Sequence, residues 1–214
     1  MKFTKFIPVA MAVALAVTPT FAADTDTVSS EFTLTNPAYF NITELPGAVK
    51  TAAGVIAEDA STGVISLSYT TPMAVTYRVV NNQKNHNVYV HANAVGANTC
   101  EALGGANVSN LKLVFANTAT KPTDAAILDA AASASTKANN ANAIAFPFQL
   151  GAVTETEGSI ADPTYASNIL TYIAQPGTFE IPYTLGTAPS DNTFSSIDQE
   201  GTYKSTLIIT DVAP

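Results

Sequence analysis

Alternation of apolar and polar residues, in short segments separated by turn residues, constrains this fold more than any other feature. It is clearest over residues 201–210, where Tyr203, Leu207 and Ile209 lie on one side and mostly Thr and Lys on the other. A period of two is what a β-strand with one buried face requires. The last segment is therefore predicted to be a strand, and Gly201 is predicted to be the turn residue that precedes it.

The same alternation recurs along the chain and predicts about ten short strands. The expected strand segments are 27–35, 39–43, 65–69, 73–80, 88–92, 111–115, 144–150, 169–173, 179–185 and 203–210. The polar residues 81–86 are expected to connect two strands as a hairpin. Pro147 and Pro182 cannot donate to a ladder, so their strands are predicted at an edge or a bulge. Residues 153–165 are expected to form a loop, and residues 48–61 a loop or one weak helical turn.

Short strands at nearly regular spacing favour an antiparallel β-sandwich over alternating β-α-β units. We expect an all-β fold of the Ig-like or jelly-roll type, with one short inserted helix over residues 122–137. Pro122 and Asp124 suit a first helical turn and the interior is mostly Ala, although an Ala-rich flexible loop is the alternative. No strong boundary divides the chain, so residues 36–214 are expected to form a single sandwich domain.

The first 22 residues have the pattern of a secretory signal peptide. Lys2 and Lys5 precede an apolar run over residues 6–17, and a small residue, Ala22, stands at the expected cleavage site. A membrane anchor is the alternative, but the run is shorter than the roughly 20 residues that span a bilayer. We therefore expect export to the cell surface or the extracellular space, with no membrane span after cleavage.

Charge and cysteine content restrict the partners. Loss of Lys2 and Lys5 with the signal peptide lowers the formal net charge from −8 to −10. Such an acidic chain is a poor ligand for nucleic acid or anionic lipid surfaces. Cys100 is the single cysteine, so no internal disulfide can form. It is expected to be a small buried or loop thiol, with pairing between molecules as the alternative.

The two histidines, His86 and His91, do not have the spacing of a helical metal pair. No Cys or carboxylate motif surrounds them, so we interpret both as solvent-facing residues. On the predicted strand that contains His91, we expect Val88, Val90 and Ala92 to face inward.

No other pattern in the sequence indicates catalysis or cofactor binding. There is no Gly-x-Ser-x-Gly elbow, and Gly104-Gly105 lacks the Lys and Ser/Thr of a phosphate loop. Acidic pairs such as Asp198 and Glu200 lack the Asp/Asn/Gly density of a calcium loop and suit a solvated surface. We therefore expect a protein that is not an enzyme and needs neither a metal nor a cofactor.

The run Gly201-Thr202-Tyr203, followed by an alternating strand, resembles the end of bacterial fimbrial-type subunits, which include chaperone–usher pilins and spore-coat-U-like proteins. In those families a Gly-x-Tyr opens the last strand at about this distance from the terminus. The chain departs from them at Ala213, where an aromatic residue is typical, and in having no paired Cys. Its layout of signal peptide, one-sided N-terminal strand, sandwich and inserted helix is also similar to TasA-type matrix-fibre subunits.

The resemblance implies assembly by strand donation. A sandwich with an unfilled groove can accept an extended segment from a neighbouring copy as an added strand. Val28, Phe32 and Leu34 lie on one side of the segment 23–35, which has the character that a donor strand needs. Copies would join head-to-tail into an open filament. The implied function is a structural subunit of an extracellular fibre or pilus, with other copies of the chain as partners.

Two alternatives stay open on the sequence alone. The N-terminal strand can fold back into its own domain and leave a monomer. The chain can also be a monomeric surface-binding or adhesin module that uses its long loops, residues 96–110 and 153–168.

Overall fold

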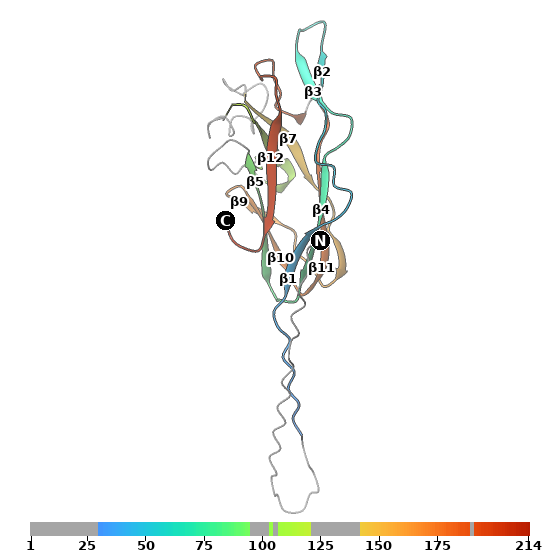
Figure 1. The fold of residues 1–214 in the computed structure, drawn as a ribbon, viewed down its shortest axis with the longest axis vertical. Coiled ribbons are helices and arrows are strands. Elements are labelled where there is room, and N and C mark those ends of the chain that lie inside the picture. Colours follow the sequence, from blue (N-terminus) through green and yellow to red (C-terminus); the bar gives the residue numbers. More distant parts are fainter. Residues whose placement is uncertain (1–29, 95–102, 105–106, 121–141, 189–190) are drawn as a thin grey trace, which may run out of the picture. The chain divides into compact units, whose positions relative to one another are not determined.

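The computed structural model describes residues 30–94, 103–104, 107–120, 142–188 and 191–214. The signal peptide, Val28, Cys100 and the expected helix lie outside the described residues. The chain divides into two units at Ala38/Tyr39, and residues 39–214 are called the body below. The regular secondary structure of the described body consists of antiparallel strands and one short 3-10 helix (Figure 1), which confirms the predicted all-β, sandwich-like class.

The described residues form twelve strands and a short 3-10 helix. The strands are β1 (Phe40–Glu44), β2 (Val55–Glu58), β3 (Ile65–Ser68), β4 (Ala74–Asn81), β5 (His86–Ala94), β6 (Lys112–Asn117), β7 (Ala143–Leu150), β8 (Thr154–Glu157), β9 (Thr164–Ala166), β10 (Ile169–Ala174), β11 (Gly177–Leu185) and β12 (Tyr203–Thr210). The 3-10 helix η1 (Val108–Asn110) precedes β6. Every strand predicted from residue 39 onwards overlaps one of these strands.

Ten strands form one continuous antiparallel sheet. Its order is β1-β4-β11-β7-β6-β12-β5-β10-β9, with β8 beside β11. The sheet folds over so that β11 faces β10 across the core, where the buried hydroxyls of Tyr183 and Tyr172 lie 3.3 Å apart. β2 and β3 pair only with each other among the described strands, in a separate two-stranded hairpin (Figure 1).

The core comes from the apolar sides of the alternating strands. Phe179, Ile181 and Tyr183 of β11 are at most 1% exposed, and Val88 and Val90 of β5 are fully buried. Burial of one such side chain stabilises the fold by about 1.5–3 kcal/mol. The inward face predicted for β5 is therefore confirmed, and the alternating apolar residues of β11 lie in the core.

The predicted hairpin between β4 and β5 is wrong. β4 pairs with β1 and β11, whereas β5 pairs with β10 and β12. The polar link between them crosses from one layer to the other, which local composition cannot distinguish from a tight turn. Residues 48–61 and 153–165 also contain β2 and β8, contrary to the expected loops. Both strands are exposed at every residue, so no buried face leaves an alternating pattern.

Pro147 and Pro182 lie in central strands and not at the edges of the sheet. The carbonyl of Pro182 accepts from Gly151 N at the break between β7 and β8, and that of Pro147 accepts from Gly186 N just beyond β11. In an antiparallel strand the N–H and C=O of one residue point to the same side. Each proline therefore directs its missing N–H at an interruption in the neighbouring strand.

Both histidines differ in exposure from the prediction. His91 was expected at the surface, but it is buried and only 6% exposed, although Asn87 and Asn93 on the same side of β5 are exposed. His86 is partly buried, since its ring lies 4.4 Å from that of Phe40. In β10 the buried residues are Leu170, Tyr172 and Ala174, whereas the apolar Ile173 is 43% exposed.

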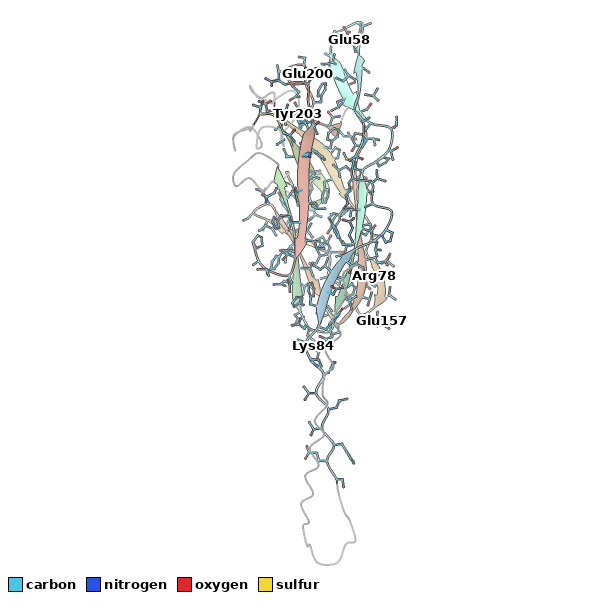
Figure 2. All side chains as sticks on the ribbon, viewed as in Figure 1. Glu58, Arg78, Lys84, Glu157, Glu200 and Tyr203 are labelled. Carbon is cyan, nitrogen blue, oxygen red and sulfur yellow. The ribbon has the colours of Figure 1, made fainter. Side chains whose placement is uncertain are left out.

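The two ends of the body carry different features (Figure 2). Lys84, in the link between β4 and β5, lies at one end, whereas Glu58, Glu200 and Tyr203 lie at the other. Tyr39, the first residue of the body, is at the Lys84 end, because its N–H donates to Asn82 Oδ1 over 2.7 Å. The chain therefore enters the body at the end opposite to the start of β12.

Candidate interaction groove

Several strand edges have no strand partner in the part of the chain that the structure describes, and two of them, on β12 and β1, lie near one groove. β12 changes partner along its length: Tyr203 and Lys204 pair with β6, whereas residues 205–210 pair with β5. Because β5 and β6 lie on opposite edges of β12, the β6-side edge of residues 205–210 is free. β1 pairs only with β4 and leaves its other edge free. A free edge offers backbone N–H and C=O groups to an added strand.

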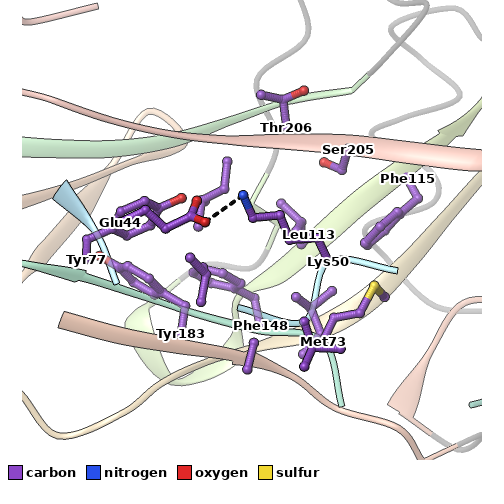
Figure 3. A pocket seen from close by; sticks show the side chains of 15 residues that line it. Glu44, Lys50, Met73, Tyr77, Leu113, Phe115, Phe148, Tyr183, Ser205 and Thr206 are labelled. Atoms are coloured by element: carbon purple, nitrogen blue, oxygen red, sulfur yellow. Dashed lines mark ion pairs between the residues drawn. The ribbon is translucent and has the colours of Figure 1, made fainter. Parts of the chain in front are cut away.

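A groove with an apolar floor opens between β12 and the segment that follows β1 (Figure 3). This narrow part has a volume of about 270 Å³. Its floor is made of core residues from β4, β6, β7 and β11 and from the segment before β4: Met73, Val75, Tyr77, Leu113, Phe115, Phe148, Tyr183 and Leu185. The groove therefore reaches directly into the hydrophobic core.

The groove widens towards the start of β12. The wide part has a volume of about 650 Å³ and reaches the base of the β2–β3 hairpin. Five residues line both parts, so they form one continuous groove: Lys50, Met73, Phe115, Ser205 and Thr206. Tyr69 and Phe115 hold Phe146 in edge-on contacts, with ring centroids 5.2 and 5.8 Å apart. The wide part is therefore lined by a group of aromatic rings that contact one another.

An ion pair lies at the mouth of the narrow part. Lys50 Nζ is 2.7 Å from Glu44 Oε1, and Figure 3 shows the pair between β12 and the aromatic floor. The two side chains are 61% and 37% exposed, so the pair contributes at most about 1 kcal/mol. An entering chain can therefore displace it at little cost. Burial, with a further contribution from the Glu44 charge, raises the pKa of Tyr77 beneath it.

Ser205 places a hydroxyl group inside the groove. It lies on the inward side of β12, in the same series as Tyr203 and Leu207, and its Oγ is buried with no hydrogen-bond partner among the described residues. A buried polar atom without a partner costs about 1–3 kcal/mol. A polar group that enters the groove and bonds to Ser205 would recover this free energy.

The predicted C-terminal residues border this groove. Tyr203 and Leu207 line it, and Tyr203, Leu207 and Ile209 all pack against the core, as their alternation predicts. Gly201 has a φ of +149°, and a Cβ there would lie 3.0 Å from Asn117 Nδ2. Glycine is therefore the residue that suits the start of β12.

No protein-family model, curated protein or solved structure matches this chain. The groove and the N-terminal segment are therefore the features from which a function can be inferred. In the extended residues 30–38, which form no strand, the predicted donor residues Phe32 and Leu34 are 77% and 76% exposed. The strand predicted over residues 27–35 is thus absent from its described part, because no partner strand completes a ladder there.

Apart from Gly201, Tyr203 and Leu207, the residues that line the groove were not predicted from the sequence. Lys50 lies in a segment without periodicity, and the residues of the floor appear in the sequence as ordinary core. Ser205 was the one available signal, since it is a polar residue that interrupts the inward series of β12. Of the two loops proposed for ligand binding, residues 96–110 lie largely outside the described part and residues 153–168 contain β8 and β9.

Within the described residues, no three His, Cys, Asp or Glu side chains are grouped so that they could hold a metal ion. His86 Nε2 lies 3.7 Å from Asp211 Oδ2, and His91 is buried on β5. Nor does any described helix have the length and apolar character needed to cross a membrane.

The buried tyrosines predict a loss of stability at alkaline pH. Burial raises the pKa of Tyr172 to about 12, above its ordinary value of 10. Between these two pH values the unfolded chain releases a proton that the folded chain keeps. Tyr172 therefore lowers the free energy of unfolding by about 1.4 kcal/mol per pH unit in this window, and its contribution is intact below pH 10.

We expect Tyr172→Phe to have a shallower loss of stability above about pH 10 than the unmodified protein. Urea unfolding at a series of pH values would measure the difference. The neutral-pH curves of the two proteins provide the reference for the cost of removing the hydroxyl. Parallel pH profiles for the two proteins would show that Tyr172 ionises as easily in the folded state as in the unfolded chain.

Proposed function

We propose that this chain is a structural subunit of an extracellular fibre or pilus, which polymerises by strand donation after export. The N-terminal segment of one copy would occupy the groove between β1 and β12 of another copy. The observation that carries this proposal is an apolar groove with a free strand edge on β12 and on β1, in a chain whose N-terminal segment exposes Phe32 and Leu34.

The chemistry of the segment and of the groove is complementary. Alternate residues of an extended segment point to the same side, so Phe32 and Leu34 can enter the groove together while Thr33 faces out. Burial of each apolar side chain contributes about 1.5–3 kcal/mol. The free edge of residues 205–210 offers ladder hydrogen bonds worth about 0.5–1.5 kcal/mol each. These gains oppose the entropic cost of association.

The positions of the two features on the body favour an open polymer. The chain enters the body at the Lys84 end, whereas the wide part of the groove lies at the Tyr203 end (Figure 2). A contact between different ends of identical molecules is heterologous and can be repeated indefinitely when the geometry does not close. Head-to-tail growth therefore follows from donation.

A deletion tests the proposal. We expect the mature chain from Ala23 to form filaments visible by electron microscopy, and the chain lacking residues 23–35 to be monomeric with a lower unfolding temperature. A peptide of residues 23–38 should restore the lost stability by filling the groove, as a bound ligand does. The matched control is the same peptide with Asp in place of Phe32 and Leu34, which should have no effect.

The alternative is a monomer whose own segment fills the groove or stays outside it. A truncated protein that is folded, monomeric and as stable as the mature chain, and that ignores the peptide, would rule out strand donation. A mature chain that remains monomeric while the deletion loses stability would indicate that the segment folds back into its own body.

A further inference from the structure

The β2–β3 hairpin carries apolar side chains that its own chain leaves exposed. Val55, Ile56 and Val64 are 49%, 61% and 63% exposed, and no strand outside the hairpin pairs with it among the described residues. A two-stranded hairpin alone is marginally stable in water. Exposed apolar residues that continue a larger apolar surface are typical of a contact surface. The hairpin lies at the same end of the body as the start of β12 (Figure 1).

One face of the hairpin continues the groove. Ile56 and Leu67 are cross-strand partners, so their side chains lie on the same face, and both line the wide part of the groove. The next pair on this face, two residues further along, is Glu58 with Ile65. Val55 belongs to the opposite face. A chain leaving the groove at this end would therefore meet Ile56 first and Ile65 next.

If the N-terminal segment is donated as proposed above, the sizes of its apolar side chains determine the direction in which it lies in the groove. Phe32 and Leu34 are larger than Val28, which precedes Phe32 by four residues, or roughly 13 Å of extended chain. The wide part of the groove lies at the start of β12, and the narrow part lies further along the strand. Phe32 and Leu34 match the wide part and Val28 the narrow one. The segment then runs antiparallel to β12, with its C-terminal end at the hairpin.

The length of the connection limits where the donating body can lie. Five residue steps separate Leu34 from Tyr39, the first residue of the body, and they span at most about 18 Å. The Tyr39 end of the donating copy must therefore lie close to the hairpin of the accepting copy. That end presents Tyr39, which is 52% exposed, and the exposed cation of Lys84, while the hairpin presents the carboxylate of Glu58 (Figure 2).

We infer that the groove-side face of the β2–β3 hairpin, with Ile56 and Ile65, is a docking surface for a second copy of this chain. It receives the end of the donating body that carries Tyr39 and Lys84. The donated segment and the hairpin then form two adjoining contacts between the same two copies. The second contact shields the groove-side face of the hairpin and limits rotation about the short connection.

Crosslinking of the mature, full chain in a Cys100→Ser background tests this contact. Ile56→Cys and Tyr39→Cys are introduced together, and filaments are treated with a short flexible bismaleimide. These two positions lie at opposite ends of one body, so a link within one copy is excluded (Figure 1). We expect a ladder of covalent multimers on a denaturing gel. The matched control, Val55→Cys with Tyr39→Cys, places its thiol on the opposite face and should give much less product.

A second measurement keeps the inference testable if the cysteine variants misfold. Filaments of Ile56→Ser/Ile65→Ser should dissociate on dilution at least about tenfold faster than the parent, since two apolar contacts are lost. Val55→Ser/Val64→Ser should dissociate at nearly the parent rate.

The outcomes separate the two proposals. Filaments that give no ladder, and that dissociate at the parent rate in the Ile56→Ser/Ile65→Ser variant, would overturn the hairpin contact and leave strand donation intact. Absence of filaments from the mature chain, both with Cys100 present and with Cys100→Ser, would overturn both.

Discussion

Replacement of Phe32 and Leu34 by Asp abolishes filament formation while the body stays folded: this is the largest effect expected. Both side chains are exposed in a single copy, so the substitutions remove no core contact. In the groove they would place two carboxylates over an aromatic floor, and burial of an unpaired charge costs several kcal/mol. The loss of apolar burial adds about 1.5–3 kcal/mol per site. We expect association to weaken by more than about four orders of magnitude.

Thr33→Asp is the matched control for this double variant. It introduces the same charge between the two sites, but on the side that faces away from the groove. Sedimentation and electron microscopy should show filaments for Thr33→Asp and none for the double variant. Filaments of normal yield from the double variant, or equal loss in the control, would remove the N-terminal segment from the assembly mechanism.

The second large effect concerns the floor of the groove, where we expect Tyr183→Ala to lower the free energy of unfolding by about 3–5 kcal/mol. Tyr183 is 1% exposed and stacks on Phe148, with ring centroids 5.1 Å apart. Its ring also contacts Tyr77, and its hydroxyl donates to that of Tyr172. Removal of the ring leaves a cavity between β10 and β11, next to the groove.

Tyr183→Phe is the control, because it keeps the ring and removes only the hydroxyl. Its cost should be about 0.5–1.5 kcal/mol, the usual contribution of one hydrogen bond. Both variants are best compared by urea unfolding in the Phe32→Asp/Leu34→Asp background, where assembly does not contribute to stability. If Tyr183→Ala cost less than Tyr183→Phe, the floor of the groove would not be part of the stabilising core.

Strands with one buried face were predictable because burial of one face requires apolar residues at alternate positions. In β11 the series Phe179, Ile181 and Tyr183 alternates with less apolar residues, and the side chains that alternate are those found in the core. β2 and β8 show no such alternation, since all their residues are exposed. Pro147 and Pro182 were expected at an edge or a bulge because proline cannot donate to a ladder, but both lie in central strands. Pro182 lies beside the break between β7 and β8, so no ladder hydrogen bond is lost at its missing N–H. The sequence does not show this break, because it depends on the positions of β7 and β8 in the sheet.

The candidate site also has one part that could be predicted from the sequence and one part that could not. The alternation of Phe32 with Leu34, and of Tyr203 with Leu207, is local, and the sequence showed both series. The groove between β12 and β1 is not local, because it exists where β6 leaves β12 after Lys204 and where β1 has no second neighbour.

By itself the sequence determined an all-β chain, the position of most strands, and the faces of β5 and β11 that are buried. Only the tertiary structure decided that β4 and β5 lie in different layers, that Ser205 lies in a groove, and that the hairpin borders it. The physical reason is that alternation in a sequence shows only whether a strand has one buried side. Which strands pair with it depends on segments that are distant in the chain. Whether a strand edge is free depends on which strands pair, so no single residue determines it.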